Sequence, residues 1–169
     1  MAATQEMLAI ALELKPFAVC LVPERREELT TEGGLNAFQE SLPEIVAKLK
    51  AAGIRTSLFI DPDLKQLEQA VKIGADAVEL HTGAYAEAKD REILKEELSR
   101  LRKGAVFAKE KGLEVHAGHG LTYENVGAVG AIKEISELNI GHYLIGAALF
   151  VGLSKAVSEM RIKMNAERL

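Results

Sequence analysis

Cysteine is nearly absent from this sequence, which excludes a fold that disulfide bonds hold together. The chain has 169 residues and one cysteine, Cys20, which lies inside the apolar run FAVCLV. A buried small hydrophobic side chain is expected at that place rather than a reactive thiol. Without disulfides the chain must fold around a hydrophobic core. With 48% hydrophobic residues, it can build one domain over residues 1–169.

The sequence also lacks a surplus of positive charge and a long hydrophobic run. A net charge of -4 cannot neutralise a phosphate backbone, so no nucleic-acid partner is expected. The longest apolar run, YLIGAALFVGL, is too short to cross a bilayer, and the N-terminus has no basic segment of a secretory signal. No spacing typical of metal ligands occurs. We therefore expect a cytoplasmic protein with no membrane contact, no metal and no cofactor.

The sequence does contain an alternation of short apolar runs and helical patterns. Strands are expected at residues 17–22, 54–60, 76–81, 113–118 and 138–142, and helices at 42–53, 63–74, 86–112, 123–136 and 153–169. Gly53, Gly74 and Gly112 stand where helices end just before a strand, which is typical of left-handed caps. This pattern predicts an α/β fold, either a (β/α)8 barrel or a doubly wound sheet.

Two features favour the barrel. A short extra helix that starts at His142 would place Ile145, Leu149 and Leu153 on one face, and barrels often carry such a helix after the last strand, aimed at a substrate phosphate. The second feature is the position of every histidine at or just beyond the end of an expected strand: His81, His116, His119 and His142. In a barrel these strand ends form the rim that carries the active site.

The segment VHAGHGLTYENV, residues 115–126, concentrates imidazole and bare backbone at one strand end. Gly118 and Gly120 remove side chains around His119, which lets backbone N–H groups approach a ligand while the imidazole gives or takes a proton. We interpret His119 as a functional residue, with a tight turn around a hydrogen-bonded histidine as the alternative. For His116 both interpretations stay open.

Other candidates lie at the same strand ends. Gly141 and the amide of His142 stand at a helix start, which is a natural anion site. Glu79 lies two residues before His81 on one pleat face, where its carboxylate could orient a base, stabilise a developing cation or form a plain ion pair.

Two loops are less specific. Thr30 lies in the polar loop ERREELTTEGGL, residues 24–35, either as a donor to a phosphate or hydroxyl group or in a turn with a helix cap. The segment FIDPD is interpreted as a turn with a helix N-cap at Asp61 or Asp63.

Five segments together resemble the pyridoxine 5'-phosphate synthase family, whose members are (β/α)8-barrel enzymes of vitamin B6 biosynthesis. They are CLVPERREELTTEGGL, SLFIDPD, ELHTGAYA, HAGHGLTYENV and ELNIGHYLIG, and they cover nearly the whole chain. The resemblance implies that 1-deoxy-D-xylulose 5-phosphate condenses with 3-amino-2-oxopropyl phosphate to give pyridoxine 5'-phosphate, phosphate and water. The partners it implies are small phosphorylated molecules, and we also expect a homo-oligomer.

Position by position, the resemblance assigns roles to single residues. His119 resembles the family's proton donor and Glu79 its transition-state-stabilising carboxylate. The implied substrate contacts are Thr30 with the deoxyxylulose phosphate, and the backbone of Gly120, Gly141 and His142 with the phosphate of the aminoketone.

The resemblance is incomplete at the N-terminus. In the family a glutamate base stands just before the position of Met1, after the third strand, and this sequence lacks it. About five strands are expected here against the eight of a barrel, so we expect an incomplete barrel that lacks the first three strands. Each uncovered large apolar side chain would forfeit roughly 1.5 to 3 kcal/mol, against a total stability of about 5 to 15 kcal/mol.

The chain is therefore expected to be a fragment or a wrongly started reading of an enzyme, or else to borrow strands or be inactive. One alternative is a truncated, non-catalytic phosphosugar-binding fragment. Another is a different barrel enzyme that acts on a phosphosugar, which the joint occurrence of AGHGLTYENV and ELHTG disfavours.

Overall fold

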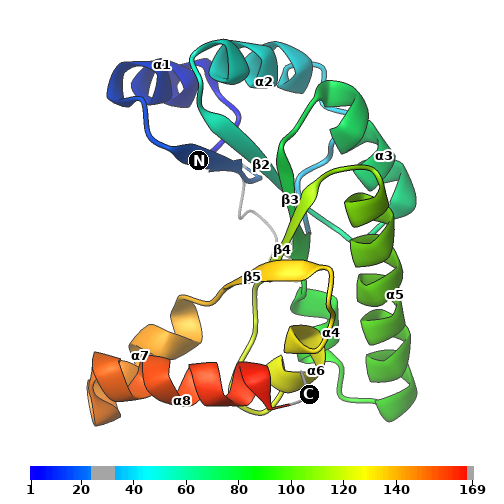
Figure 1. Cartoon of the computed structure of the whole chain (residues 1–169), viewed down its shortest axis with the longest axis vertical. Helices are drawn as coiled ribbons and strands as arrows, with labels where there is room; N and C mark the ends of the chain where they lie inside the picture. Colours follow the sequence, from blue (N-terminus) through cyan, green and yellow to red (C-terminus); the bar gives the residue numbers. More distant parts are fainter. Residues whose placement is uncertain (24–32, 167–169) are drawn as a thin grey trace.

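A computed structural model of the chain describes residues 1–23 and 33–166. Strands and helices alternate along most of it (Figure 1). The strands are β1 (Ala18–Leu21), β2 (Arg55–Ile60), β3 (Ala77–His81), β4 (Glu114–Gly118) and β5 (Ile135–Asn139). The helices are α1 (Gln5–Leu14), α2 (Leu42–Ala51), α3 (Leu64–Ile73), α4 (Gly83–Glu87), α5 (Arg91–Glu110), α6 (Val126–Gly130), α7 (His142–Val151) and α8 (Leu153–Asn165).

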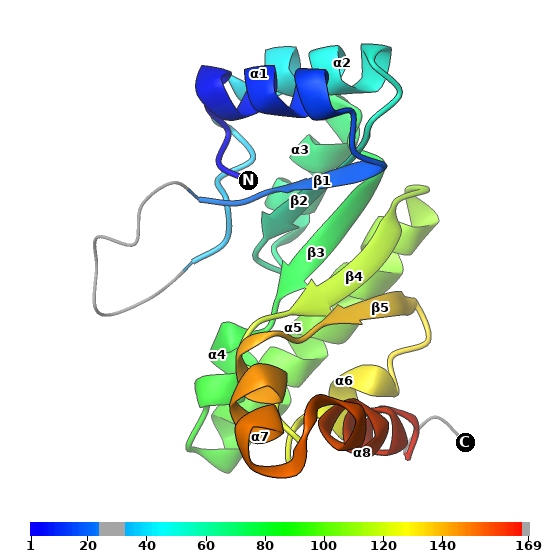
Figure 2. The same ribbon diagram turned by 90° about the vertical axis from the view of Figure 1, so that its left-hand side faces the viewer.

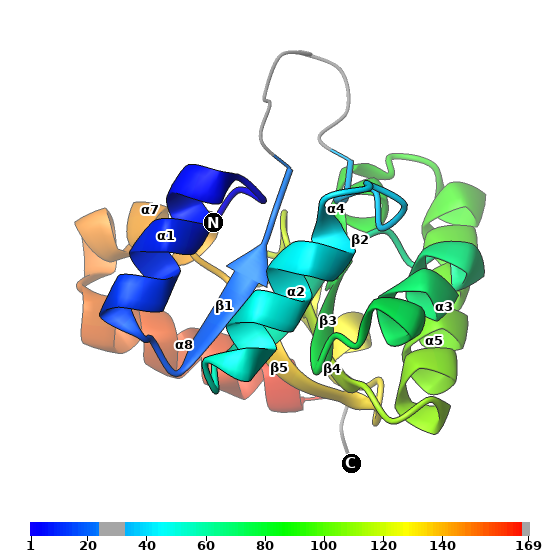
Figure 3. The same cartoon turned by 90° about the horizontal axis from the view of Figure 1, so that it is seen from above.

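The strands form one parallel five-stranded sheet whose order follows the chain, β1-β2-β3-β4-β5. Figure 2 shows them side by side in this order. The sheet is curved, with α2, α3 and α5 on its outer side (Figure 1), and α3 and α5 lie against each other (Figure 3). A doubly wound sheet reverses its strand order at a switch point, so the continuous order excludes that alternative.

The pleat gives the sheet two unlike faces. In β2, Leu58 and Ile60 are fully buried towards the helices, whereas Ser57 and Phe59, which alternate with them, are only partly buried. In β3, Leu80 is buried and Glu79 is partly exposed. Successive side chains of a strand point to opposite faces, so apolar residues meet the helix layer and polar residues remain on the open face.

The core lies between the sheet and its helices. Its fully buried large side chains come from strands and helices alike: Leu21, Leu58, Ile60, Val78 and Leu80 from the sheet, and Leu42, Ile45, Val46, Leu49, Leu67 and Leu101 from α2, α3 and α5. One contiguous cluster reaches from Leu8 to Met160.

The expected helix ends are confirmed where glycine closes them. Gly53, Gly74 and Gly112 have φ angles of 75°, 86° and 86°, in the left-handed region that favours glycine. Of the two aspartates proposed as caps, Asp63 caps α3, since its carboxylate accepts hydrogen bonds from the backbone N–H groups of Lys65 and Gln66.

The long helix expected at residues 86–112 is divided in two. It consists of α4 and α5, because the carboxylate of Asp90 accepts hydrogen bonds from the N–H groups of Glu92 and Ile93 and starts a new helix. An N-cap aspartate satisfies donors that a continuous helix would pair with carbonyls. Helix α1, whose N-cap is Thr4, is not among the helices expected from the sequence.

The last strand lies earlier than expected. Instead of residues 138–142 it covers Ile135–Asn139, and the helix expected at 123–136 shrinks to α6. Ile135 pairs with Val115 in the sheet and is buried, while the Ser136 hydroxyl donates to the Val115 carbonyl at 3.1 Å. These contacts hold Ile135 and Ser136 in the strand.

Helix α7 starts at His142 as expected, but it does not pack through the predicted apolar face. Ile145 and Leu149 are 60% and 81% exposed, and Leu153, which belongs to α8 rather than α7, is 56% exposed. Within the described ranges, no helix combines the length and the apolar character needed to cross a membrane.

Replacing a core residue of the central strand should destabilise the chain. Leu80→Ala removes a fully buried side chain, and we expect the free energy of unfolding to fall by about 2 to 5 kcal/mol. Leu149→Ala is the matched control, since this leucine is 81% exposed, and should change stability by less than about 0.5 kcal/mol. Urea unfolding followed by circular dichroism measures both. Equal effects of the two substitutions would contradict the assignment of the core.

Candidate functional site

Polar side chains gather where the central strands end. The register pairs His81 of β3 with Gly118 of β4, and Gly118 in turn with Asn139 of β5. Asp61 follows β2 directly, and His119 follows β4. Because carboxyl ends of parallel strands meet at one edge of a sheet, these residues belong to one edge. This edge is the candidate site.

The backbone at His119 has an unusual conformation. His119 has a φ angle of 87° and Gly120 one of 75°, both in the region that non-glycine residues rarely adopt. Buried Thr82 stabilises this turn, since its backbone N–H donates to the Gly118 carbonyl at 2.9 Å. Its hydroxyl reaches the carbonyl oxygens of both Gly118 and His119. The turn therefore fixes the imidazole of His119 at the strand end.

His81 and His119 lie against each other. Their ring centroids are 4.9 Å apart, and the ring of Phe59 stands edge-on to His81 at 5.0 Å. The Nδ1 atom of His81 lies 3.1 Å from Oδ1 of Asp61. The hydrogen bond with His81 lowers the pKa of Asp61, so this carboxylate stays ionised.

Glu79 lies on the open face of β3, next to Cys20 of β1. The Cys20 thiol donates to Oε2 of Glu79 across 3.6 Å. Burial, followed by the negative charge of Glu79, raises the pKa of Cys20 to about 12. On the other side, a Cβ atom at Gly118 would come within 2.5 Å of Oε1 of Glu79, so glycine makes room for this carboxylate below the His119 turn.

The three proposed phosphate contacts lie on two loops of this edge. A Cβ atom at Gly120 would meet Cβ of Ala86 at 2.7 Å, so a side chain has no room there. Gly141 and His142 are exposed at the start of α7, where the first N–H groups of a helix have no intrahelical partners. They follow β5, the neighbour of β4. Thr30 lies outside the described residues.

His116 differs from the other histidines. It lies within β4, and its Nε2 atom is 3.1 Å from Oε1 of Glu114, at the start of the strand. Arg55 donates to the other oxygen of the same carboxylate. Hydrogen bonds from His116 and Arg55 lower the pKa of Glu114 to about 2. This group therefore belongs to the amino end of the sheet, away from the rim.

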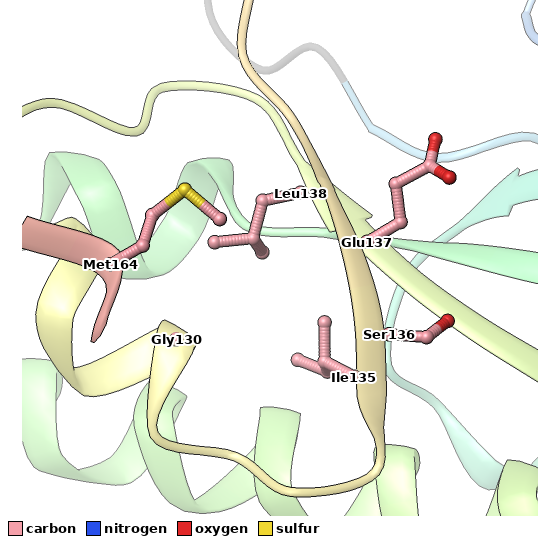
Figure 4. A pocket seen from close by; sticks show the side chains of 6 residues that line it. All are labelled: Gly130, Ile135, Ser136, Glu137, Leu138 and Met164. Carbon is pink, nitrogen blue, oxygen red and sulfur yellow. The ribbon is translucent and has the colours of Figure 1, made fainter. Parts of the chain in front are cut away.

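A small hollow lies elsewhere, between β5 and α8. Gly130, Ile135, Ser136, Glu137, Leu138 and Met164 line it. In Figure 4, Ile135, Leu138 and Met164 point into it while Glu137 points away. Its volume of about 20 Å³ holds about one water molecule, so a phosphosugar does not fit. Over residues 1–23 and 33–166, no group of three or more His, Cys, Asp or Glu side chains is placed to hold a metal ion.

Sequence reasoning missed three residues of the site. Asp61 was interpreted only as a helix cap, and Phe59 and Thr82 were not considered. The histidines were singled out because they lie at strand ends. Asp61 follows the run SLFI, so the same rule also applies to it. For Phe59 and Thr82 no signal was present, since their contacts depend on residues about 40 to 60 positions away in the chain.

Comparison with known proteins shows one consistent family. A family model described as pyridoxal phosphate biosynthesis protein PdxJ matches residues 1–166. Pyridoxine 5'-phosphate synthase of Zymomonas mobilis is 58% identical over 99% of this chain and 66% of its own length. The proteins of that name in Aliivibrio fischeri and Caulobacter vibrioides are 56% and 53% identical, with 70% and 68% of their lengths matched. The chain thus spans about two thirds of the length of these relatives.

Solved structures at low identity share the fold. A structure of the Amycolatopsis orientalis BexX/CysO complex matches with a TM-score of 0.65 at 18% identity, over 95% of this chain and 59% of that one. The citrate synthase SbnG matches with a TM-score of 0.59 at 13% identity, over 98% of this chain and 71% of that one. At such identities the likeness shows the fold alone.

The reactivity of Cys20 should depend on Glu79. Only the thiolate is a nucleophile, and a pKa of about 12 leaves almost none near neutral pH. We expect slow alkylation in the native chain and a faster reaction in Glu79→Gln, which removes the nearby negative charge. Glu137→Gln, on the far edge strand, should not change the rate. Mass spectrometry of the iodoacetamide adduct over time measures this, and equal rates in all three proteins would refute the contact.

Glu114 should make stability depend on acid pH. Its pKa is depressed from 4.5 to about 2 in the folded chain, so its contribution is complete above about 4.5 and is lost as pH falls towards about 2. Glu114→Gln should therefore lower the melting temperature near neutral pH, and the difference from the wild type should vanish over this window. Glu13→Gln, on exposed α1, serves as the control. A pH-independent difference would argue against the ion pair.

Proposed function

We infer that the chain acts in the synthesis of pyridoxine 5'-phosphate, because it belongs to the family described as pyridoxal phosphate biosynthesis protein PdxJ. The reaction condenses 1-deoxy-D-xylulose 5-phosphate with 3-amino-2-oxopropyl phosphate, with loss of phosphate and water. The observation that carries this proposal is the glycine-flanked His119, held by Thr82 at the carboxyl edge of the sheet. It follows β4, whose neighbour β5 leads into α7.

The five-stranded sheet is proposed to be an arc of a (β/α)8 barrel. Its strands follow one another in order, the sheet curves with α2, α3 and α5 on its outer side (Figure 1), and TIM-barrel-like structures are among its neighbours. The partly exposed side chains Ser57 and Glu79 lie on the face away from these helices. Pairing can also extend beyond β1, because Ala2 forms a parallel bridge with Val22. In a closed barrel the open face of the sheet would line the interior, and both sheet edges would lie at the seam where the barrel closes.

His119 is proposed to donate protons during the condensation. Joining an amine to a ketone requires repeated proton transfers, which a positioned imidazole performs near neutral pH. The fixed turn supports this role, since it orients the ring before substrate arrives. Glu79, on the open face just below this turn, is proposed to stabilise the cationic character that develops in the transition state.

Backbone amides are proposed to bind the phosphate of the aminoketone. The candidates are Gly120 and the start of α7 at Gly141 and His142, where free N–H groups and the helix dipole favour an anion. Thr30, outside the described residues, is proposed to contact the phosphate of the deoxyxylulose substrate on the strength of the family resemblance. Two phosphorylated substrates require two such anion sites.

The chain is further proposed to form a single domain and a homo-oligomer in the cytoplasm. One contiguous core supports the single domain. Large exposed apolar side chains on α7, such as Leu149 at 81% and Phe150 at 90%, support contact with another polypeptide, because a monomer rarely leaves a contiguous patch of this kind uncovered.

Activity should depend on the imidazole of His119. His119→Asn is the suitable change, because asparagine tolerates a positive φ angle. We expect product formation from both substrates to fall by about 10²- to 10⁴-fold, measured by chromatography of pyridoxine 5'-phosphate. The control is Lys15→Asn, an exposed position with a φ angle of 48° at the end of α1, which should leave the rate unchanged.

The same assay separates the alternatives. An undiminished rate in His119→Asn would remove the proposed proton donor. If the wild-type chain forms no product but binds 1-deoxy-D-xylulose 5-phosphate in calorimetry, a non-catalytic phosphosugar-binding role is supported instead.

A further inference from the structure

His81 is a buried imidazole that the proposed reaction leaves without a role. It is 8% exposed and ends the central strand β3. Its Nδ1 atom is 3.1 Å from Oδ1 of Asp61. Its Nε2 atom is buried, and among the described residues it has no hydrogen-bond partner. A buried polar atom without a partner is costly to stability and rare in native proteins, so it calls for a functional reason.

The contact with Asp61 determines where His81 carries its proton. The hydrogen bond with His81 lowers the pKa of Asp61, so this group is an ionised carboxylate, which only accepts hydrogen bonds. The Nδ1 atom must therefore be the donor. The Nε2 atom is buried and has no hydrogen-bond partner in the described part of the chain. The hydrogen-bond geometry thus places a proton on Nδ1 and leaves Nε2 as the unpaired nitrogen.

Gly83 shows where that bare atom points. A Cβ atom at Gly83 would lie 2.8 Å from both Cε1 and Nε2 of His81, and 3.2 Å from Cδ2 of His119. The two imidazoles thus border the same small space at the start of α4, with their centroids 4.9 Å apart. Phe59 packs edge-on against His81, so the His81 ring has little freedom to rotate.

Asp61 is not the helix cap that the sequence left open for it. The sequence suggested a helix cap, but Asp63 caps α3. Asp61 instead accepts two hydrogen bonds on the same oxygen, from His81 and from the Gly34 backbone N–H at 3.4 Å. It therefore connects the segment after β1 to the ring that contacts His119.

We propose that Asp61 is a positioning residue of the site: it fixes His81 as the Nδ1-protonated tautomer, and His81 in turn orients the ring of His119. This inference deepens the proposed function and rests on it for the role of His119. In this arrangement the carboxylate of Asp61 sets the tautomer and the direction of His81, and His81 lies next to His119, the proposed reacting group.

Nitrogen-15 NMR of histidine-labelled protein tests the first part of this proposal. In the wild type we expect His81 to show a protonated Nδ1 and a bare Nε2. Asp61→Ala should abolish this preference and shift the ring signals of His119. Asp61→Asn should preserve the tautomer, because its amide oxygen can accept the same two hydrogen bonds. Asp63→Ala, which removes a carboxylate two residues away, should change neither histidine.

Kinetics test the second part. In Asp61→Ala we expect kcat to fall roughly 10- to 100-fold while KM for both phosphorylated substrates stays nearly unchanged, because phosphate binding uses other groups. Asp61→Asn should recover part of kcat, and Asp63→Ala should match the wild type. A merely structural role of Asp61 would lower the fraction of folded protein in Asp61→Ala but leave kcat per folded molecule unchanged, and this result would overturn the proposal.

The NMR and kinetic results can fail separately. A wild-type His81 protonated at Nε2 or at both nitrogens would overturn the proposal, and this measurement needs no variant to fold. The proposal would also be overturned if the ring signals of His119 were the same in Asp61→Ala as in the wild type. Absence of product from the wild-type chain would instead count against the proposed function, and the NMR result would still decide the role of Asp61.

Discussion

The structure depends on the pleat of five parallel strands, because alternation along each strand separates an apolar face from a polar one. Leu58 and Leu80 are fully buried under the helices, whereas Glu79 and His116 occupy the other face of the same sheet. A parallel sheet that is covered on both faces would be apolar throughout. The polar open face therefore explains why the candidate site residues lie on one side, and the common direction of the strands explains why they gather at one edge.

Glycine determines how closely groups approach at that edge. Gly118 leaves room for the Glu79 carboxylate, and Gly83 leaves room for the rings of His81 and His119. At Gly120 both the left-handed backbone and the nearby Cβ of Ala86 exclude a side chain. His119 itself has a positive φ angle, which costs free energy for a non-glycine residue. Its turn persists because buried Thr82 binds the carbonyls on either side, so the rigidity of the site comes from residues that do not themselves react.

Much of the fold was predictable from local pattern, since strands at 54–60, 76–81 and 113–118 and the glycine caps agree with β2, β3, β4 and the observed φ angles. The prediction was wrong where tertiary contacts override pattern, as in β5, whose start is set by pairing of Ile135 with Val115. The strand-end rule correctly placed His81, His119 and His142 at the edge. It was wrong for His116, which lies inside β4 and contacts Glu114 at the amino end of that strand. The rule did not reveal that His81 pairs with Asp61 rather than with Glu79. The pleat determines on which face of the sheet a side chain lies, but it does not determine which partner the side chain contacts.

The two ends of the open face differ in how completely their polar groups are paired. At the amino end, Glu114 binds Arg55 and His116 at once, and its lowered pKa reflects a saturated carboxylate. At the carboxyl end, His81 has one nitrogen paired with Asp61, and its Nε2 atom has no partner among residues 1–23 and 33–166. Saturated networks stabilise a fold, whereas an unpaired buried atom lowers stability and persists only where something else requires it. The same sheet thus separates a fully paired polar cluster at its amino end from an incompletely paired one at its carboxyl end, and the carboxyl end is the one at which we propose the chemistry.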